Sequence, residues 1–351
     1  MITRPKIAYV LDPRFPGGTS SAVAAELECV SQTARVEVHA ISTAMFPGQP
    51  VAPQLASVLR RLNIPLIWDA GEISGDAVIL HNPSCLKFQE TLDTTIIAKR
   101  LVVVAHENFL RPGGAEAFDV ARCLDLIARC SVTLERSIAP ISPWNRKTVE
   151  QWLLANPSYD VWSVLDWDWF NICAFDRHPP TAFPTDRRGR HSRAGFEKFP
   201  QRDVMDLCFP QTAKQNTILG ADNFLGEPNT PTHWTLYPFG GVSLAHFFEQ
   251  IDFFVYFTAA TWRESFGRVL AEAVAAGKIA ISDVDTAASF DGAVIGASPA
   301  DVTAIVKGYL IDPDRYQDDV LAGQKKLEQF SSQAFRRSFD AFLMPQTEVS
   351  T

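Results

Sequence analysis

Two glutamates in the stretch from Asp252 to Ser282 carry the strongest chemical signal in the chain. Glu264 precedes a predicted helix, and Glu272 lies inside it, roughly 9 Å along the axis at 1.5 Å per residue. The free amides around Phe266 and Gly267 would form an anion site at the helix start, and Gly267 would let a phosphate approach the backbone closely. Glu264 would then face a group beyond the phosphate, and Glu272 would hold two ribose hydroxyls. A nucleotide diphosphate sugar has its parts in this order.

The elements that position these glutamates follow from the local pattern. The apolar run from Phe253 to Phe257 predicts a buried strand. Ser265 is expected to cap a helix over 266–276, and Gly277 to end it in the C′ position. The run 278–282 predicts the next strand, so the stretch is a β-loop-α-β unit. The ordinary alternative is a pair of solvated glutamates on a helix that packs against a sheet.

The same residues resemble the donor-binding signature of the retaining glycosyltransferases of family 4. The resemblance rests on Glu264-Ser265-Phe266-Gly267, then Glu272 after four residues, then Ala275-Ala276-Gly277. It implies the α/β GT-B fold, in which two Rossmann-like domains with parallel sheets face each other across a cleft. It also implies a nucleotide-diphosphate sugar as substrate, with no protein nucleophile, no metal ion and no cofactor.

A basic run over 186–198 is the strongest positive patch of the sequence. A solvated charge run is the usual explanation of such a patch. In the resemblance, Gly189-Arg190 followed by Lys198 corresponds to the arginine and lysine that clamp the donor diphosphate. The spacing is longer than in the commonest version of the motif, although a subgroup carries Gly-Arg-His-Ser-Arg, as this chain does.

The N-terminal half offers a glycine loop and two histidines. A strand over 7–11 leads to Gly17 and Gly18, which open a helix and can approach a phosphate or a sugar closely. His81 and His106 both follow predicted strands, where parallel sheets place their ligands. A histidine there is more often a hydrogen-bonded structural residue. The resemblance places Gly17 and Gly18 at the cleft and His106 against the donor sugar. For His81 the only indication of a functional role is its position at the end of a strand.

Strands alternate with helices along the chain, which predicts doubly wound parallel sheets. We expect an acceptor-side domain over 1–166, a proline-bearing linker over 167–185, a nucleotide-sugar domain over 186–331, and a tail helix over 332–351 that returns to the first domain. Five tryptophans cluster near the linker, where they suit a packed hinge face or, as the functional alternative, stacking on a sugar acceptor. They are Trp144, Trp152, Trp162, Trp167 and Trp169.

Composition narrows the function classes. The chain has 351 residues, and 46% of them are hydrophobic, which is enough for two cores. A net charge of −8 argues against a nucleic-acid binder. Six scattered cysteines suit reduced thiols, and neither a signal peptide nor a transmembrane segment is expected, so we predict a cytoplasmic protein. Peripheral contact with a membrane stays open.

We therefore expect a retaining, metal-independent hexosyltransferase of polysaccharide or glycoconjugate biosynthesis. His106 and Glu264 are the candidate catalytic residues, and the acceptor is a glycan, a lipid-linked sugar or another hydroxyl compound. Two alternatives stay open at this point: a nucleotide-sugar epimerase on the same fold, and a two-domain sugar-binding protein without chemistry. The sugar, the base, the linkage and the oligomeric state are not disclosed by the sequence.

Overall fold

The computed structural model describes residues 4–15, 17–193 and 195–344. The chain divides into two compact units. Unit 1 comprises Met1–Ile172 together with Phe330–Thr351, and unit 2 comprises Cys173–Gln329. Each unit holds one parallel sheet, of seven strands in unit 1 and six in unit 2, so the predicted α/β class with two parallel sheets is confirmed.

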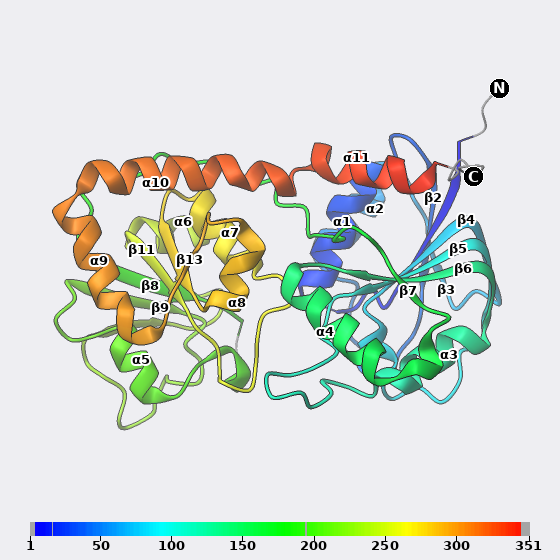
Figure 1. The fold of residues 1–351 in the computed structure, drawn as a ribbon, viewed down its shortest axis with the longest axis horizontal. Coiled ribbons are helices and arrows are strands. Elements are labelled where there is room, and N and C mark those ends of the chain that lie inside the picture. Colours follow the sequence, from blue (N-terminus) through cyan, green and yellow to red (C-terminus); the bar gives the residue numbers. More distant parts are fainter. Residues whose placement is uncertain (1–3, 16, 194, 345–351) are drawn as a thin grey trace. The chain divides into compact units, whose positions relative to one another are not determined.

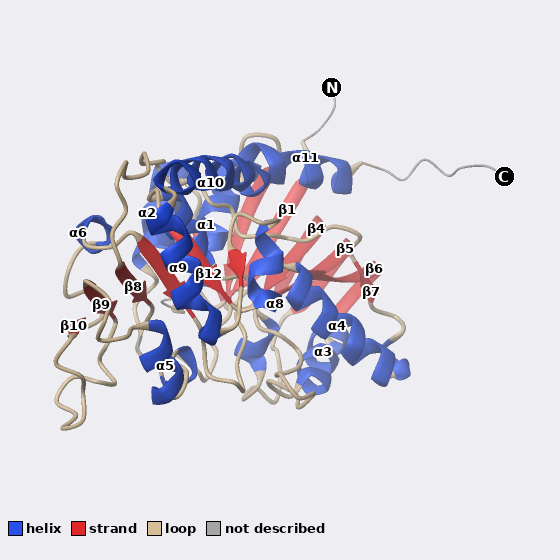
Figure 2. Cartoon of the chain, turned by 60° about the vertical axis from the view of Figure 1, so that its left-hand side comes forward, coloured by secondary structure: helices blue, strands red, loops and turns tan. Residues whose placement is uncertain are grey.

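The unit 1 sheet has the strand order β3-β2-β1-β4-β5-β6-β7, and the direction of progress reverses between β1 and β4. Figure 2 shows β1, β4, β5, β6 and β7 side by side in this order. Helices α1, α2 and α11 lie along one face of the sheet, while α3 and α4 cover the other (Figure 1). The strands are β1 (Lys6–Leu11), β2 (Arg35–Ala40), β3 (Leu66–Trp68), β4 (Glu72–His81), β5 (Thr95–Ala105), β6 (Ser131–Pro140) and β7 (Ser163–Val164); the helices are α1 (Gly18–Val30), α2 (Pro53–Leu62), α3 (Val120–Arg129), α4 (Pro143–Ala155) and α11 (Ser332–Leu343).

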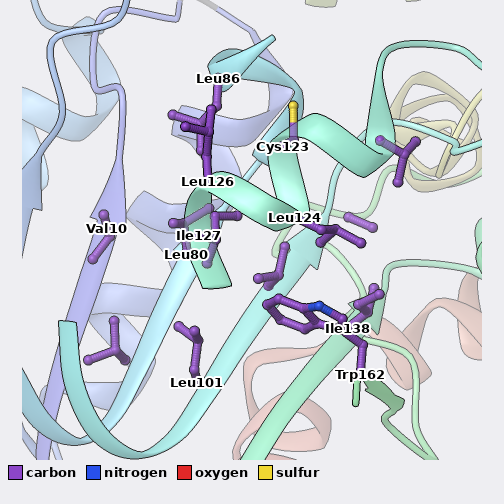
Figure 3. Packing of buried hydrophobic residues seen from close by; sticks show 14 of the residues in the cluster. Val10, Leu80, Leu86, Leu101, Cys123, Leu124, Leu126, Ile127, Ile138 and Trp162 are labelled. Atoms are coloured by element: carbon purple, nitrogen blue, oxygen red, sulfur yellow. The ribbon is translucent and has the colours of Figure 1, made fainter. Parts of the chain in front are cut away.

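A hydrophobic core fills the space between this sheet and helices α3 and α4 (Figure 3). Alternate residues of the strands, such as Leu80 of β4 and Leu101 of β5, point into it because successive side chains of a strand face opposite ways. Leu124 and Ile127 of α3 pack on them from above the sheet. The opposite face of β1 and β4 therefore turns its own alternate residues, Tyr9 and His81 among them, towards α1.

The unit 2 sheet has the order β10-β9-β8-β11-β12-β13, and its reversal lies between β8 and β11. All its neighbouring strands run parallel. The strands are β8 (Arg187–His191), β9 (Gln215–Leu219), β10 (Trp234–Tyr237), β11 (Phe253–Tyr256), β12 (Ile279–Ser282) and β13 (Ile295–Gly296); the helices are α5 (Arg202–Cys208), α6 (Leu244–Glu249), α7 (Arg268–Ala275), α8 (Val284–Ala287), α9 (Val302–Ile311) and α10 (Pro313–Lys326).

The basic run turned out to be a central strand. β8 lies between β9 and β11, and its Arg188 side chain is fully buried. Arg188 donates to both carboxylate oxygens of Asp186 at 2.6 and 3.0 Å, and Arg187 pairs with Asp252 at 2.7 Å. These paired charges satisfy the guanidinium groups inside the sheet, so the expected solvated or ligand-facing run is mostly internal structure.

Helix α7 begins two residues later than predicted. Its N-cap is Gly267, not Ser265, and Gly267 has φ +86° and ψ +42°, a left-handed conformation that cannot continue a helix. The predicted helix end is correct, because Ala276 is the C-cap and Gly277 follows it with φ +77°.

The aromatic residues around the predicted linker pack within unit 1. Trp169 is fully buried and meets the rings of Phe335 and Phe339 of α11 at 5.5 and 5.7 Å between centroids. Trp167 stacks on Trp169, with centroids 5.0 Å apart. These contacts attach α11 to unit 1, and α11 is described as far as Leu343, with the residues after Met344 lying outside the described part. Within the described residues, no helix has the length and apolarity to cross a membrane.

Candidate functional site

Each sheet has a point where the strand order reverses, and in open parallel sheets ligands bind at the carboxyl ends of the strands at such a point. In unit 2 the loops that leave this point are 192–198 after β8 and 257–267 after β11. In unit 1 they follow β1 at Asp12 and β4 at Asn82. Every candidate site residue predicted from the sequence, apart from Arg190 within β8 and Glu272 within α7, lies on or next to one of these loops or at the end of the adjacent strand β5.

Lys198 and Glu264 meet across the two loops of unit 2. The Lys198 Nζ lies 2.7 Å from Oε1 of Glu264, and the Tyr256 hydroxyl donates to the same oxygen at 2.6 Å. Burial raises the pKa of Glu264, but Lys198 and the Tyr256 hydrogen bond outweigh it, so the pKa lies below its ordinary value. Glu264 is therefore a carboxylate. The bond from Lys198 to Glu264 uses one of the three N–H donors of the Lys198 ammonium group.

Arg190 lies beside this pair but is fully buried. Its guanidinium donates to the carbonyls of Phe257, at 2.8 Å, and Lys198, and it lies over the rings of Tyr256 and Phe199 at 4.8 and 4.2 Å. Arg190 and Glu264 thus share Tyr256 as a neighbour. A direct contact between Arg190 and a phosphate stays a prediction, and its buried guanidinium favours a role in supporting the loop that carries Lys198.

Arg193 is the arginine of this loop that faces solvent. Its side chain is half exposed, its Nη2 lies 3.7 Å from Glu197, and its charge contributes to lowering the pKa of Glu264. In the sequence, Arg193 is a member of the basic run and the last residue of the Gly-Arg-His-Ser-Arg motif, but neither feature distinguishes it from Arg190. Its position after the end of β8 was the available signal, because the residue that follows a buried strand reaches the site while the strand's own residues do not.

The start of α7 completes this edge of unit 2. Gly267 is the N-cap residue of α7 and carries no side chain that could cap the helix. Phe266 is buried against Phe290 with ring centroids 5.7 Å apart, so it fixes the turn while its backbone forms part of the helix start. The first amides of a helix attract anions, and here they adjoin the loop of Glu264.

Glu272 lies farther along α7, facing a cavity of about 500 Å³ between α6, α7 and the segment 175–179. Arg268 donates to its Oε1 at 3.2 Å, and the Nε2 of His191 lies 3.4 Å from its Oε2. Burial raises the pKa of Glu272, against the opposing charge of Arg268, and burial lowers the pKa of His191 to about 3. A neutral imidazole beside a carboxylate at the wall of a cavity can bind hydroxyl groups.

The glycine loop of unit 1 is held by Asp12. Asp12 accepts two hydrogen bonds from the Arg14 side chain, at 2.9 and 2.7 Å, and one from the Thr43 hydroxyl at 2.6 Å. Gly17 is the N-cap of α1 without a capping side chain, and Gly18 is exposed with open space around it. The loop is therefore fixed at its base and open at the helix start, as a binding loop requires; its Pro16 lies outside the described residues.

His106 follows β5 and contacts His81 at the end of the neighbouring strand β4. The Nε2 of His106 lies 2.9 Å from the Nδ1 of His81, and burial lowers the pKa of His106 to about 3. His106 is partly exposed and His81 is fully buried. Strand ends mark both positions in the sequence but not their contact, and nothing there indicates the buried Glu26 behind His81, because these residues are distant in the sequence.

The structure thus groups the predicted residues in two places. Unit 2 brings together Lys198 and Glu264 beside the start of α7, with Glu272 on the same helix. Unit 1 holds Gly17, Gly18 and His106 at the carboxyl edge of its own sheet.

Comparison with known proteins supports the architecture. No protein-family model and no curated protein matches the sequence. Among solved structures, HepE of Anabaena in complex with UDP is 15% identical over 96% of this chain and 99% of its own, with a TM-score of 0.65. Sucrose-phosphate synthase from Thermosynechococcus elongatus is 12% identical over 97% of this chain and 98% of its own, with a TM-score of 0.61. An alpha-glucosyltransferase in complex with UDP-glucose and DNA containing an abasic site is 11% identical over 97% of this chain and 100% of its own, with a TM-score of 0.58. At these identities the likeness concerns the fold, and this chain has the GT-B fold with two Rossmann-like domains.

Proposed function

We propose that this chain is a glycosyltransferase that moves a sugar from a nucleotide-diphosphate sugar to a hydroxyl acceptor. The observation that carries the proposal is the meeting of Lys198 and Glu264, 2.7 Å apart, at the strand-order reversal of unit 2 and beside the start of α7, whose N-cap residue is a glycine. A cation and helix amides suit a diphosphate, and an adjacent ionised carboxylate suits the hydroxyls of a sugar.

The donor diphosphate is assigned to Lys198, Arg193 and the backbone at Phe266 and Gly267. Lys198 has two N–H donors left beside its bond to Glu264, and Arg193 is half exposed. These groups neutralise the charge that develops on the leaving diphosphate, which is why we propose that the reaction needs no metal ion. The guanidinium of Arg190 donates to the backbone carbonyl of Lys198 and so holds the loop that carries Lys198 in place.

The nucleoside is assigned to the neighbourhood of Glu272. Its carboxylate can accept hydrogen bonds from two ribose hydroxyls, and the cavity that it lines has a volume within the range of small-molecule sites. Structures of HepE hold UDP and UDP-glucose, so uridine diphosphate hexoses are the first donors to test.

In unit 2 the transferred sugar is assigned to Glu264; in unit 1 His106 is proposed as a sugar-binding residue, with Gly17 and Gly18 on the acceptor side. In the retaining reaction that we propose, the bond between the sugar C1 and the phosphate oxygen breaks as the acceptor oxygen bonds to C1 on the same face. The acceptor proton passes to the leaving phosphate oxygen, so no protein nucleophile takes part. The acceptor is proposed to be a glycan, a lipid-linked sugar or another hydroxyl compound.

The function is tested by incubating the protein with a panel of nucleotide sugars, with and without hydroxyl acceptors. Release of a nucleoside diphosphate together with a glycosylated acceptor is the expected result, and EDTA should not abolish it. An isomerised donor without release would identify an epimerase instead, and binding without any reaction would identify a sugar-binding protein.

The two glutamates separate donor binding from turnover. Because Glu272 is assigned to the ribose, Glu272→Ala should weaken both the donor and the free nucleoside diphosphate, by about 1 to 3 kcal/mol for a lost charge-assisted bond. Glu264→Ala removes a group that orients the reacting sugar, so kcat should fall while diphosphate affinity stays nearly intact. Calorimetric titration of the diphosphate, paired with turnover measurements, gives the comparison.

Glu227→Ala is the matched control, because Glu227 is an exposed glutamate of a unit 2 loop. It should change neither quantity. Equal losses of diphosphate affinity in Glu264→Ala and Glu272→Ala would reverse the assignment of the sugar side, and normal activity in both would return these glutamates to an ordinary structural role.

A further inference from the structure

Three side chains of unit 1 form a polar chain that leads from the interior to the partly exposed His106. Glu26 of α1 lies with its Oε2 3.5 Å from the Nε2 of His81, and the Nδ1 of His81 lies 2.9 Å from the Nε2 of His106. The first distance is at the limit of a hydrogen bond and the second is well within it. The series from Glu26 through His81 ends at the Nδ1 of His106, for which the described residues provide no hydrogen-bond partner.

The interior part of this chain is enclosed. Glu26 and His81 are 1% and 0% exposed, and the ring of Tyr9 stacks on His81 with centroids 5.5 Å apart. Trp169 donates to Oε2 of Glu26 at 3.0 Å. Within the described part of the chain, neither Oε1 of Glu26 nor Nε2 of His81 has a hydrogen bond by strict geometry. An apolar residue at position 26 would pack here at a lower cost, so helix packing alone does not explain the carboxyl group.

When Glu26 is protonated, the hydrogen bonds run outwards. Across the 3.5 Å contact the carboxyl group can act as a donor to a bare Nε2 of His81, and this leaves the proton of His81 on its Nδ1, from which it is donated to the Nε2 of His106. Neutral His106 then carries its own proton on Nδ1, towards the exposed side. Burial raises the pKa of Glu26 to about 8, although the Trp169 hydrogen bond lowers it, so this is the state of the chain at neutral pH.

When Glu26 is ionised, the same bonds run inwards. His81 now donates from Nε2 to the carboxylate and accepts at Nδ1, so His106 must donate from Nε2 and present a bare Nδ1. The two states differ by one proton. It leaves the Nδ1 of His106, while one proton moves from His81 to His106 and another from Glu26 to His81, and the negative charge remains on Glu26.

We propose that Glu26 acts through His81 as a positioning residue that selects the tautomer of His106, so that the outer nitrogen of His106 is a donor in one state and an acceptor in the other. The assignment of His106 to the transferred sugar rests on the proposed function, but the coupling itself rests only on the contacts above. Sugar hydroxyls donate and accept, so the state of Glu26 determines which hydrogen bond His106 makes with a hydroxyl of the ligand.

Other titratable groups near the chain are few. Tyr9 faces it from β1, and Cys29 lies one helical turn after Glu26 in α1. Arg336 and Asp340 of α11 act on Cys29 and do not contribute to the pKa of Glu26. Burial raises the pKa of both Tyr9 and Cys29, so neither changes charge at neutral pH. A proton transition of this chain between pH 7 and 9 therefore belongs to Glu26 and the two histidines as a coupled group.

The test uses long-range ¹H–¹⁵N correlation spectra of the full chain with ¹⁵N-labelled histidine, which report the protonated nitrogen of each imidazole ring. The chain has seven histidines, and His81→Gln and His106→Gln assign the two signals. In the unsubstituted protein, His106 should change from the Nδ1–H to the Nε2–H form between pH 7 and 9. In Glu26→Gln, whose amide donates to His81 at every pH, His106 should keep the Nδ1–H form throughout.

Two further variants keep the test decisive. Tyr9→Phe retains the ring on His81 and removes a hydroxyl without a described partner, so the transition should stay in place. Trp169→Phe removes the donor to Glu26, so the transition should move to higher pH. A transition that is absent from the unsubstituted protein, or unchanged in Glu26→Gln, would overturn the proposal. The spectra need no substrate, so loss of the glycosyltransferase assignment would leave this result standing.

Discussion

Glu26 is a carboxyl group that the fold keeps in its neutral form. It projects from α1 towards the unit 1 sheet, with one indole N–H as its hydrogen-bond donor and with the buried His81 and the partly exposed His106 beyond it. Nothing local in the sequence singles it out, because an isolated glutamate in a helix is an ordinary surface residue. Its environment is created by His81 and Trp169, which are distant in the chain.

The raised pKa of Glu26 makes unit 1 less stable as the pH rises. In the unfolded chain the carboxyl group ionises near pH 4.5, whereas in the folded unit it keeps its proton up to about pH 8. The folded state binds the extra proton in this window, so the free energy of unfolding falls between these two pH values. Glu26→Gln removes the effect, and its gain in stability over the unsubstituted protein should grow to a few kcal/mol by pH 8.

Thermal unfolding at pH 5, 6.5 and 8 measures this difference. Glu28→Gln is the matched control, since Glu28 is a half-exposed residue of the same helix that pairs with Arg61, and it should show no gain that increases with pH. A constant offset between Glu26→Gln and the unsubstituted protein at all three pH values would contradict the buried, protonated state of Glu26.

Sequence reasoning reached the site residues where a local pattern marks them. Glu264, Glu272 and Lys198 stand in a motif, and the structure brings Glu264 and Lys198 into contact. Sequence reasoning did not distinguish the buried Arg190 from the exposed Arg193, because the motif gives residue types and their order but not their burial. The difference arises from β8, whose last residues turn inwards while Arg193 follows the strand.

At the scale of elements, β8 shows why a charged segment can form a central strand. Its arginines are internal because Asp186, Asp252 and several backbone carbonyls compensate them. Those partners lie before the strand, at the end of α5 and at both ends of β11, so no short window along the sequence contains the complete set. The apolar strands β1, β11 and β12, by contrast, were predicted to within one residue of their observed bounds, since apolar runs report burial directly.

The start of α7 makes a prediction about glycines in unit 2. Gly267 has φ +86°, and a Cβ there would lie 3.1 Å from a methyl group of Leu270, so Gly267→Ala should cost about 1 to 2 kcal/mol. Gly308 lies inside α9, and a Cβ added there would have no atom within 4 Å, so Gly308→Ala should stabilise the unit by about 0.5 to 1 kcal/mol.

Both variants are compared by unfolding in urea, with the amide exchange of β11 and β12 as the measure of unit 2 stability. Shifts of opposite sign are expected. If Gly267→Ala were neutral, the left-handed start of α7 would not be required, and the assignment of the diphosphate to the backbone at this turn would lose its structural basis.

At the scale of the whole molecule, unit 1 is assembled from two separate segments of the chain. Phe335 of α11 is fully buried, and its ring packs against Trp167, Trp169 and Phe170. The final helix is therefore part of the unit 1 core, although all of unit 2 precedes it in the sequence.

Phe335→Ala should destabilise unit 1 by about 3 to 5 kcal/mol, because it removes a buried ring from an aromatic cluster. Hydrogen exchange should become faster in the strands of unit 1 and stay unchanged in those of unit 2. Tyr316→Ala is the reciprocal variant, since Tyr316 is a fully buried residue of α10 in unit 2. Equal acceleration in both units with either variant would show that they unfold together.

The interrupted course of unit 1 has a consequence for its synthesis on the ribosome. Residues 1–172 leave the exit tunnel before any of unit 2, and α11 emerges only after unit 2. At roughly 5 to 20 residues per second, the nascent chain spends on the order of ten to thirty seconds with its tryptophan face uncovered. During that interval the growing polypeptide exposes an apolar, aromatic surface that chaperones can bind. A circular permutant that begins with α11 would close this surface first and should depend less on such assistance.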